Sequence, residues 1–128
     1  MKKFLLLLLA PLLMSTQCES DDEPIFNTEF LIQNNSDQDI IYLTFEDNEV
    51  LIKSQSHQFI AVSSNTVSFV KPTENIAFDE VQLYSKNGSG SLTLIYEQNP
   101  IVDSLWTFSK LSTYEANFKL IINNQLLD

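Results

Sequence analysis

The sequence predicts an all-β protein, and three observations support that expectation. Apolar and polar residues alternate with period two in several short runs, most clearly between Tyr114 and Ile122. Clusters of Asn, Asp, Ser, Gly and Pro separate these runs and are typical of turns. No stretch after the first twenty residues has convincing helical periodicity, although residues 103–114 have room for one helical turn. We therefore expect an antiparallel β-sandwich of immunoglobulin-like architecture, or a small barrel, with about eight strands.

The individual strands are defined by their alternation and by the turns between them. In the last run, Phe118 and Leu120 share one face and Lys119 lies on the other, as in a half-buried strand. The Asn87-Gly88 pair favours a two-residue hairpin turn, because both central residues of that turn take positive φ. The strands on either side of it should therefore be antiparallel neighbours. The predicted strands are residues 26–33, 40–45, 50–53, 58–62, 67–70, 77–84, 92–96, 105–108 and 114–122.

Large apolar side chains are numerous enough in these runs to form the core of one domain of about 100 residues. In the second run, the alternation of Ile41, Leu43 and Phe45 predicts that these three side chains point inward. The full predicted core consists of Phe30, Ile32, Ile41, Leu43, Phe45, Phe59, Phe69, Leu92, Leu94, Trp106, Phe118 and Leu120.

The first residues have a different character from the rest of the chain. Lys2 and Lys3 precede an apolar run from Phe4 to Met14 that contains five successive leucines. A membrane-spanning helix needs about 20 apolar residues, so this run is too short to be one. Its length and its leading lysines predict an export signal.

The only cysteine, Cys18, follows the apolar run in the segment Ser15-Thr16-Gln17-Cys18. This segment resembles the lipobox of bacterial lipoproteins, with Ser15 and Gln17 where that motif usually has Leu and Gly or Ala. The resemblance implies cleavage before Cys18, attachment of a diacylglyceryl group to its sulfur, and acylation of the new amino terminus. Two or more acyl chains anchor a protein stably, whereas one gives only reversible binding. The implied partner of Cys18 is therefore a membrane.

Directly after Cys18, residues 19–24 contain four acids in five positions and then a proline. Such a segment cannot pack against a core, so we expect an extended, hydrated tether. It is similar to the acidic surface-export signal that some Gram-negative bacteria place after a lipidated cysteine. This resemblance implies lipid anchoring in the outer membrane and display on the cell surface, with the periplasmic face as the alternative. The predicted organisation is a signal peptide over 1–17, the lipidated cysteine and tether over 18–24, and one β-sandwich domain over 25–128.

Charge and composition exclude several classes of protein. The 128 residues include 7 lysines and 17 acids, and residues 25–128 retain five lysines against thirteen acids, a net charge of −8. Nucleic-acid binding relies on clustered cations, so we expect no nucleic-acid partner. One Cys and one His exclude a disulfide framework and a zinc cluster built from these residues. We expect no cofactor.

The sequence contains no recognisable catalytic constellation. His57 is the only histidine, and it lies in the polar segment 54–58, where we expect a solvated loop. The segment Gly88-Ser89-Gly90 lacks the Gly-x-Ser-x-Gly spacing of a nucleophile elbow. We therefore predict that the protein is not an enzyme and has no catalytic residues.

Two acidic turns are candidates for a calcium site, because calcium prefers hard oxygen ligands. They lie at opposite ends of the predicted strand 40–45, and neither has the glycine and closing glutamate of an EF-hand loop. The alternative is that both segments are turns whose carboxylates are hydrated and bind no ion. The candidate ligands are Asp37, Asp39, Glu46, Asp47 and Glu49.

The segment Asp103-Ser104-Leu105 is similar to a three-residue motif that some exported bacterial proteins use for O-glycosylation. This resemblance marks Ser104 as a candidate modification site.

Three functional hypotheses remain open at this stage. The leading one is a surface-anchored, non-enzymatic lipoprotein that contacts a partner protein or glycan. The second is a carbohydrate-binding or adhesin module. Exposed aromatic residues on the same face of one sheet would favour it, and full burial of Tyr42, Tyr84, Tyr96 and Trp106 would disfavour it. The third is a hydrolase fragment or inhibitor, which would need an open cleft holding His57 beside an acid and a hydroxyl.

Overall fold

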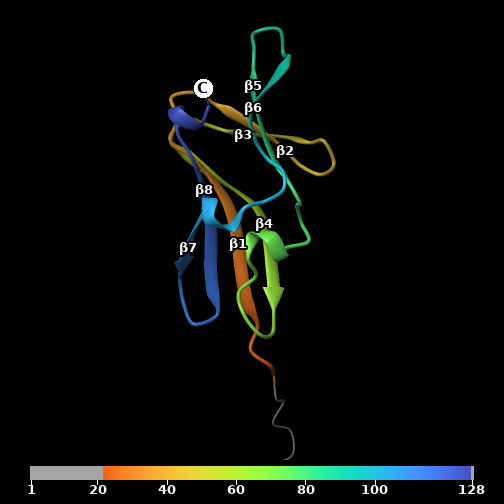
Figure 1. Cartoon of the computed structure of the whole chain (residues 1–128), viewed down its shortest axis with the longest axis vertical. Coiled ribbons are helices and arrows are strands. Elements are labelled where there is room, and N and C mark those ends of the chain that lie inside the picture. Colours follow the sequence, from red (N-terminus) through yellow and green to blue (C-terminus); the bar gives the residue numbers. More distant parts are fainter. Residues whose placement is uncertain (1–21, 128) are drawn as a thin grey trace, which may run out of the picture.

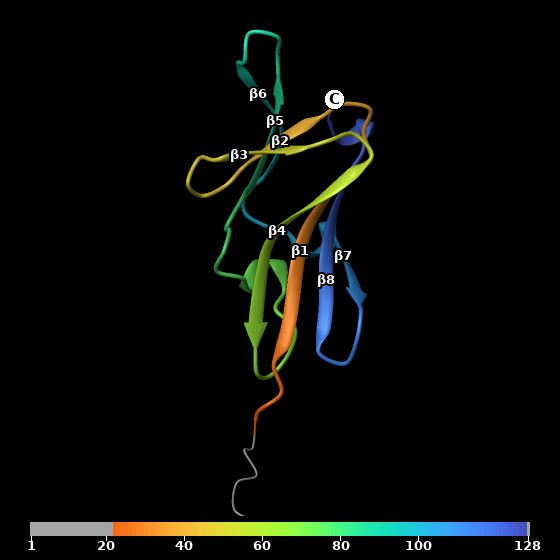
Figure 2. The same cartoon turned by 180° about the vertical axis from the view of Figure 1, so that it is seen from behind.

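The computed structural model describes residues 22–127, and these form a β-sandwich of two four-stranded sheets (Figures 1 and 2). The predicted sandwich is thus confirmed. The predicted signal peptide over 1–17, Cys18 and the first tether residues lie outside the described residues. Within residues 22–127, no helix is long and apolar enough to cross a membrane.

The first sheet has the strand order β4-β1-β8-β7. The central strands β1 and β8 are parallel, with Phe30 opposite Phe118, and every other neighbouring pair in the two sheets is antiparallel. The β1–β4 register shifts between Phe30 and Leu31. The strands are β1 (Phe26–Asn34), β4 (Ser56–Asn65), β7 (Trp106–Lys110) and β8 (Glu115–Ile122).

The second sheet has the order β3-β2-β5-β6 and is built from two hairpins. Figure 1 shows the β5–β6 hairpin extending from the end of the molecule opposite the tether, and the β2–β3 hairpin extending to one side. The strands are β2 (Ile40–Leu43), β3 (Glu49–Ile52), β5 (Val81–Lys86) and β6 (Leu92–Gln98). Three short 3-10 turns complete the fold: η1 (Pro72–Glu74), η2 (Asp103–Leu105) and η3 (Asn124–Leu126).

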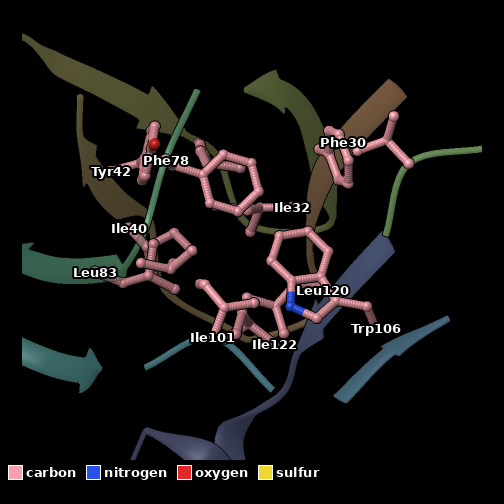
Figure 3. Packing of buried hydrophobic residues seen from close by; sticks show 13 residues of the cluster. Phe30, Ile32, Ile40, Tyr42, Phe78, Leu83, Ile101, Trp106, Leu120 and Ile122 are labelled. Atoms are coloured by element: carbon pink, nitrogen blue, oxygen red, sulfur yellow. The ribbon is translucent and has the colours of Figure 1, made fainter. Parts of the chain in front are cut away.

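The core lies between the sheets and combines aliphatic residues with three packed aromatic rings (Figure 3). Phe30 from β1 meets the rings of Phe78 and Trp106 edge-on, and Phe78 stacks on Trp106 with 5.6 Å between ring centroids. Both arrangements suit the quadrupoles of aromatic rings. The predicted core residues Phe30, Ile32, Trp106 and Leu120 are confirmed here, and Phe118 packs against the cluster.

Strand β2 has the opposite phase from the one predicted. Ile40 and Tyr42 face the core, whereas Phe45 lies beyond the strand end with 93% of its surface exposed. Ile41 is 5% exposed although it is outside the core cluster. The prediction failed because residues 40–43 are all apolar, so their alternation alone does not identify the inner face. The predicted core positions Phe59 and Leu94 are also exposed, and Leu43, Phe69 and Leu92 are only partly buried.

One predicted strand, residues 67–70, and the first half of another, residues 77–84, are loops instead. Residues 67–70 pair with no strand, and the N–H of Val70 donates to Oγ1 of the buried Thr28 at 3.0 Å. Residues 77–80 are irregular because Oδ1 of Asn75 accepts from the N–H groups of Ala77 and Phe78, which fixes a side-chain turn.

The β5–β6 hairpin is confirmed, but its turn differs from the predicted two-residue type. Lys86 pairs with Leu92, so residues 87–91 form the connection. The side-chain oxygen of Asn87 accepts from the N–H groups of Ser89 and Ser91, and Gly90, not Gly88, takes the positive φ of 86°. Asn87 thus closes the longer loop with its side chain.

Candidate binding groove

The β2–β3 turn forms one wall of a hollow of about 250 Å³ on the described residues. Thr44 and Asn48 close the turn: the N–H of Thr44 donates to the carbonyl of Asn48, and the N–H of Asn48 donates to Oγ1 of Thr44. Asp47 takes a φ of 58°, a left-handed conformation that Asp tolerates better than most residues. Phe45 lies inside this closed turn, and 93% of its surface is exposed.

The opposite wall is the segment that follows η1. In this segment Phe78 enters the core at 8% exposure, whereas Ile76 is fully exposed, and Asn75 accepts from the N–H groups of Ala77 and Phe78. Pro72 is buried and holds the start of this segment against the domain. The wall is therefore fixed at both ends by packing.

Two adjoining hollows, of about 250 and 270 Å³, share Phe45, Phe78 and Asp79 in their linings. Because they share these residues, we treat the two hollows together and call them the Phe45 groove. Its lining residues are Tyr42, Leu43, Thr44, Phe45, Asp47, Asn75, Ile76, Ala77, Phe78, Asp79, Glu80 and Gln82. Volumes of this size suit side chains or one sugar ring rather than a large cofactor.

The groove combines apolar surface with negative charge. Three of its lining residues, Asp47, Asp79 and Glu80, are acids, and the lining contains no Lys, Arg or His. Oε2 of Glu80 accepts from Nδ2 of Asn99, which holds that carboxylate in place. Burial raises the pKa of the Tyr42 phenol on the inner side of the groove, because the low-dielectric surroundings disfavour the phenolate.

The candidate calcium ligands are distributed over several separate contacts. Asp37 pairs with the side chain of Asn124, and Asp39 accepts from the N–H of Ser54. Glu49 forms a 2.6 Å ion pair with Lys86. Glu46 accepts from Asn48, and only Asp47 lines the groove. Within residues 22–127, no group of three or more His, Cys, Asp or Glu side chains is arranged to hold a metal ion.

His57 occupies a strand rather than the predicted loop. It is exposed on β4, as expected of a solvated side chain, and its ring meets that of Phe59 edge-on at 5.7 Å. It pairs across the strands with Gln33 and is not part of the groove. Ser104, the candidate modification site, is exposed in η2 beside Asp103, whose carboxylate accepts from Thr73.

The four aromatics whose full burial would disfavour a carbohydrate-binding module divide into two pairs. Tyr42 and Trp106 are buried, which counts against their role as a platform, while Tyr84 and Tyr96 are partly buried. The hydroxyl of Tyr84 donates to Gln82, and that of Tyr96 accepts from Gln98. Among the Phe, Tyr and Trp residues of the described part of the chain, the most exposed is Phe45, which the sequence assigned to the core. The one signal in the sequence that could have indicated the exposure of Phe45 is the turn sequence Glu46-Asp47-Asn48 directly after it. A turn at that point allows the strand to end before Phe45.

Comparison of the chain with protein-family models, with curated proteins and with solved structures returned no match. A functional proposal therefore depends on the residues of the chain and on the geometry of the groove.

Proposed function

We propose that the protein is a lipoprotein that is anchored through Cys18 to the bacterial outer membrane and displayed on the cell surface. We further propose that its domain is a non-enzymatic interaction module that binds a partner protein in the Phe45 groove. The observation that carries the second proposal is the 93% exposure of Phe45 beside three carboxylates with no base in the lining. An exposed apolar surface with a polar rim is typical of an interaction site.

The negative charge of the groove favours a positively charged partner segment. The groove and the domain as a whole are negative, so an acidic partner segment would be repelled. A segment that carries Lys or Arg beside Leu, Ile or an aromatic residue would pair with Asp47 and Asp79 while its apolar side chain covers Phe45. Fully burying a Phe side chain contributes about 1.5 to 3 kcal/mol. We therefore expect Phe45→Ser to weaken binding by a factor of about 10 to 100.

Selection from random peptides displayed on phage, with the full-length protein as bait, tests this proposal. The enriched peptides should carry Lys or Arg within two positions of a large apolar residue, and synthetic copies should bind with a measurable dissociation constant. Phe59→Ser is the matched control, because it removes a half-exposed Phe on β4, outside the groove. If the enriched peptides bind Phe45→Ser as tightly as they bind Phe59→Ser, the groove is not the binding site.

The anchor requires a separate measurement in the native bacterium. Intact mass should show a chain that begins at Cys18 and carries acyl groups, and Cys18→Ser should remain an unprocessed precursor. Protease treatment of whole cells should degrade the wild-type protein if it is displayed on the surface. An unmodified Cys18 in the mature protein would disprove the anchor. If protease degrades the protein only after the outer membrane is ruptured, and not in whole cells, the protein lies on the periplasmic face.

A glycan is the second candidate occupant, because the exposed Phe45 ring could stack on the apolar face of a sugar while carboxylates of Asp47 and Asp79 accept from its hydroxyl groups. A panel of neutral oligosaccharides discriminates between the two occupants. Binding of a neutral oligosaccharide that Phe45→Ser abolishes would assign the groove to a glycan rather than to a basic peptide segment.

A further inference from the structure

A second apolar surface lies at the end of the sandwich where the tether joins the domain. Three segments meet there: the residues before β1, the loop after β4 and the turn between β7 and β8. The ring of Phe26 lies 5.2 Å from that of Phe69 and 5.3 Å from that of Tyr114, and the N–H of Asn27 donates to the carbonyl of Tyr114. Figures 1 and 2 show from opposite sides that all three segments lie at this end.

Each of these segments exposes an apolar side chain. Val67 is 81% exposed, Leu111 is 57% exposed, and Ile25 and Tyr114 are about half exposed. We call these four residues the tether-end patch. The ring of the partly buried Phe26 packs against those of Phe69 and Tyr114, and Tyr114 is itself a member of the patch. The patch is therefore carried by packed residues at three separate points of the chain.

Three of the four sequence neighbours of Val67 and Leu111 are polar and uncharged. Val67 lies between Thr66 and Ser68, and Leu111 is followed by Ser112 and Thr113. Glu29 and Glu115 line one hollow with Leu111, and the Glu115 carboxylate accepts from the hydroxyl of Ser112. Insertion of Leu111 must therefore leave these two carboxylates at the hydrated edge of the patch. Lys110, the charged sequence neighbour of Leu111, has a long stem that allows its ammonium group to stay in water.

The position of Cys18 identifies the surface that this end meets. Ile25 is only seven positions after Cys18, and a fully extended chain of that length spans at most about 25 Å. With acyl chains on Cys18, this end of the domain stays within that distance of the lipid surface, where even weak contacts form at high effective concentration. The β5–β6 hairpin, at the opposite end in Figure 1, is held away from it.

We propose that the tether-end patch inserts into the headgroup region of the leaflet that holds the anchor, with Val67 and Leu111 entering deepest. This inference rests on the proposed lipid anchor at Cys18. Insertion at three points around the tether fixes the orientation of the domain, so that the Phe45 groove stays in water and accessible to a partner. Tyr114 contributes an amphipathic ring, a type of side chain that is enriched at membrane interfaces.

Site-specific fluorescence on the full-length lipidated protein tests the inference in phosphatidylethanolamine–phosphatidylglycerol vesicles. Lipidation blocks the only native thiol, so an environment-sensitive dye attaches solely to an introduced cysteine. The variants are Val67→Cys and Leu111→Cys, with Ser89→Cys in the exposed β5–β6 loop as the matched control. Lipids that carry a nitroxide near the headgroup should reduce the fluorescence at positions 67 and 111 by about half or more and leave position 89 unchanged.

The experiment distinguishes a failure of the proposed insertion from a failure of the proposed anchor. If the protein floats with the vesicles, carries its acyl groups by mass, and shows no quenching at 67 and 111, the inference is wrong while the anchor stands. The same result is expected if a partner protein, rather than lipid, covers the patch. Equal quenching at all three positions would mean that the domain has no fixed orientation, and it also overturns the inference. A protein that does not float and has an unmodified Cys18 disproves the anchor and the insertion together.

Discussion

The side-chain oxygen of Gln98 accepts a hydrogen bond from the indole nitrogen of Trp106 at 2.9 Å, and this bond joins the two sheets in the buried layer. The same oxygen accepts from the N–H of Val102 at 3.0 Å, and Nε2 of Gln98 donates to the hydroxyl of Tyr96. Gln98 is 4% exposed, so it supplies partners for polar groups that have little access to water.

Replacement of Gln98 with Leu should therefore be costly. The variant leaves the indole N–H and the N–H of Val102 without their acceptor, and we expect the free energy of unfolding to fall by about 2 to 3 kcal/mol. Urea unfolding can be followed by the fluorescence of Trp106, the only tryptophan. Gln125→Leu, at an exposed position in η3, is the matched control and should change the stability by less than about 0.5 kcal/mol. Equal stability of the two variants would contradict this role for Gln98.

A second buried amide ties the end of β1 to the other sheet. Nδ2 of Asn34 donates to the carbonyls of Gln38 and Ile52, and its Oδ1 accepts from the N–H and the hydroxyl of Ser36. We expect Asn34→Ala to reduce the free energy of unfolding by about 3 kcal/mol, because it leaves several of these groups unpaired. Asn35→Ala provides the comparison, since Asn35 is exposed and its backbone bond to Ile122 survives the change. A loss at Asn34 no larger than that at Asn35 would contradict the expectation.

Two phenylalanines assigned to the core by the sequence should respond very differently to substitution. Phe30 is fully buried among the rings of Phe78, Trp106 and Phe118, and we expect Phe30→Ala to destabilise the domain by about 3 to 5 kcal/mol. Phe45 extends into solvent, so Phe45→Ser should stay within about 0.5 kcal/mol of the wild type. Thermal unfolding of the two variants checks this, and a large loss in Phe45→Ser would mean that its ring packs in the core after all.

These two residues also show what could be predicted from the sequence. Phe30 was assigned correctly because β1 carries polar residues such as Glu29 on its other face, and β8 alternates in the same way. The sandwich class followed from such strands and from the turns between them. Phe45 was misassigned because β2 consists of four consecutive apolar residues, for which either phase satisfies the pattern. The candidate groove could not be predicted, since it joins a hairpin turn to a loop that is 30 residues further along the chain, and only the tertiary fold brings Phe45 to Ile76.

The raised pKa of Tyr42 predicts a loss of stability at alkaline pH. Burial keeps this phenol neutral in the folded protein, whereas in the unfolded chain it ionises near its ordinary pKa of about 10. Above that pH the unfolded state binds fewer protons than the folded state, so stability falls as pH rises and is fully present below it. Tyr42→Phe should show a smaller decline in the free energy of unfolding between about pH 9 and pH 11, measured in urea at each pH. Tyr114→Phe, which changes an exposed tyrosine, is the control and should retain the wild-type decline. An unchanged decline in Tyr42→Phe would show that the Tyr42 phenol contributes nothing to the loss of stability.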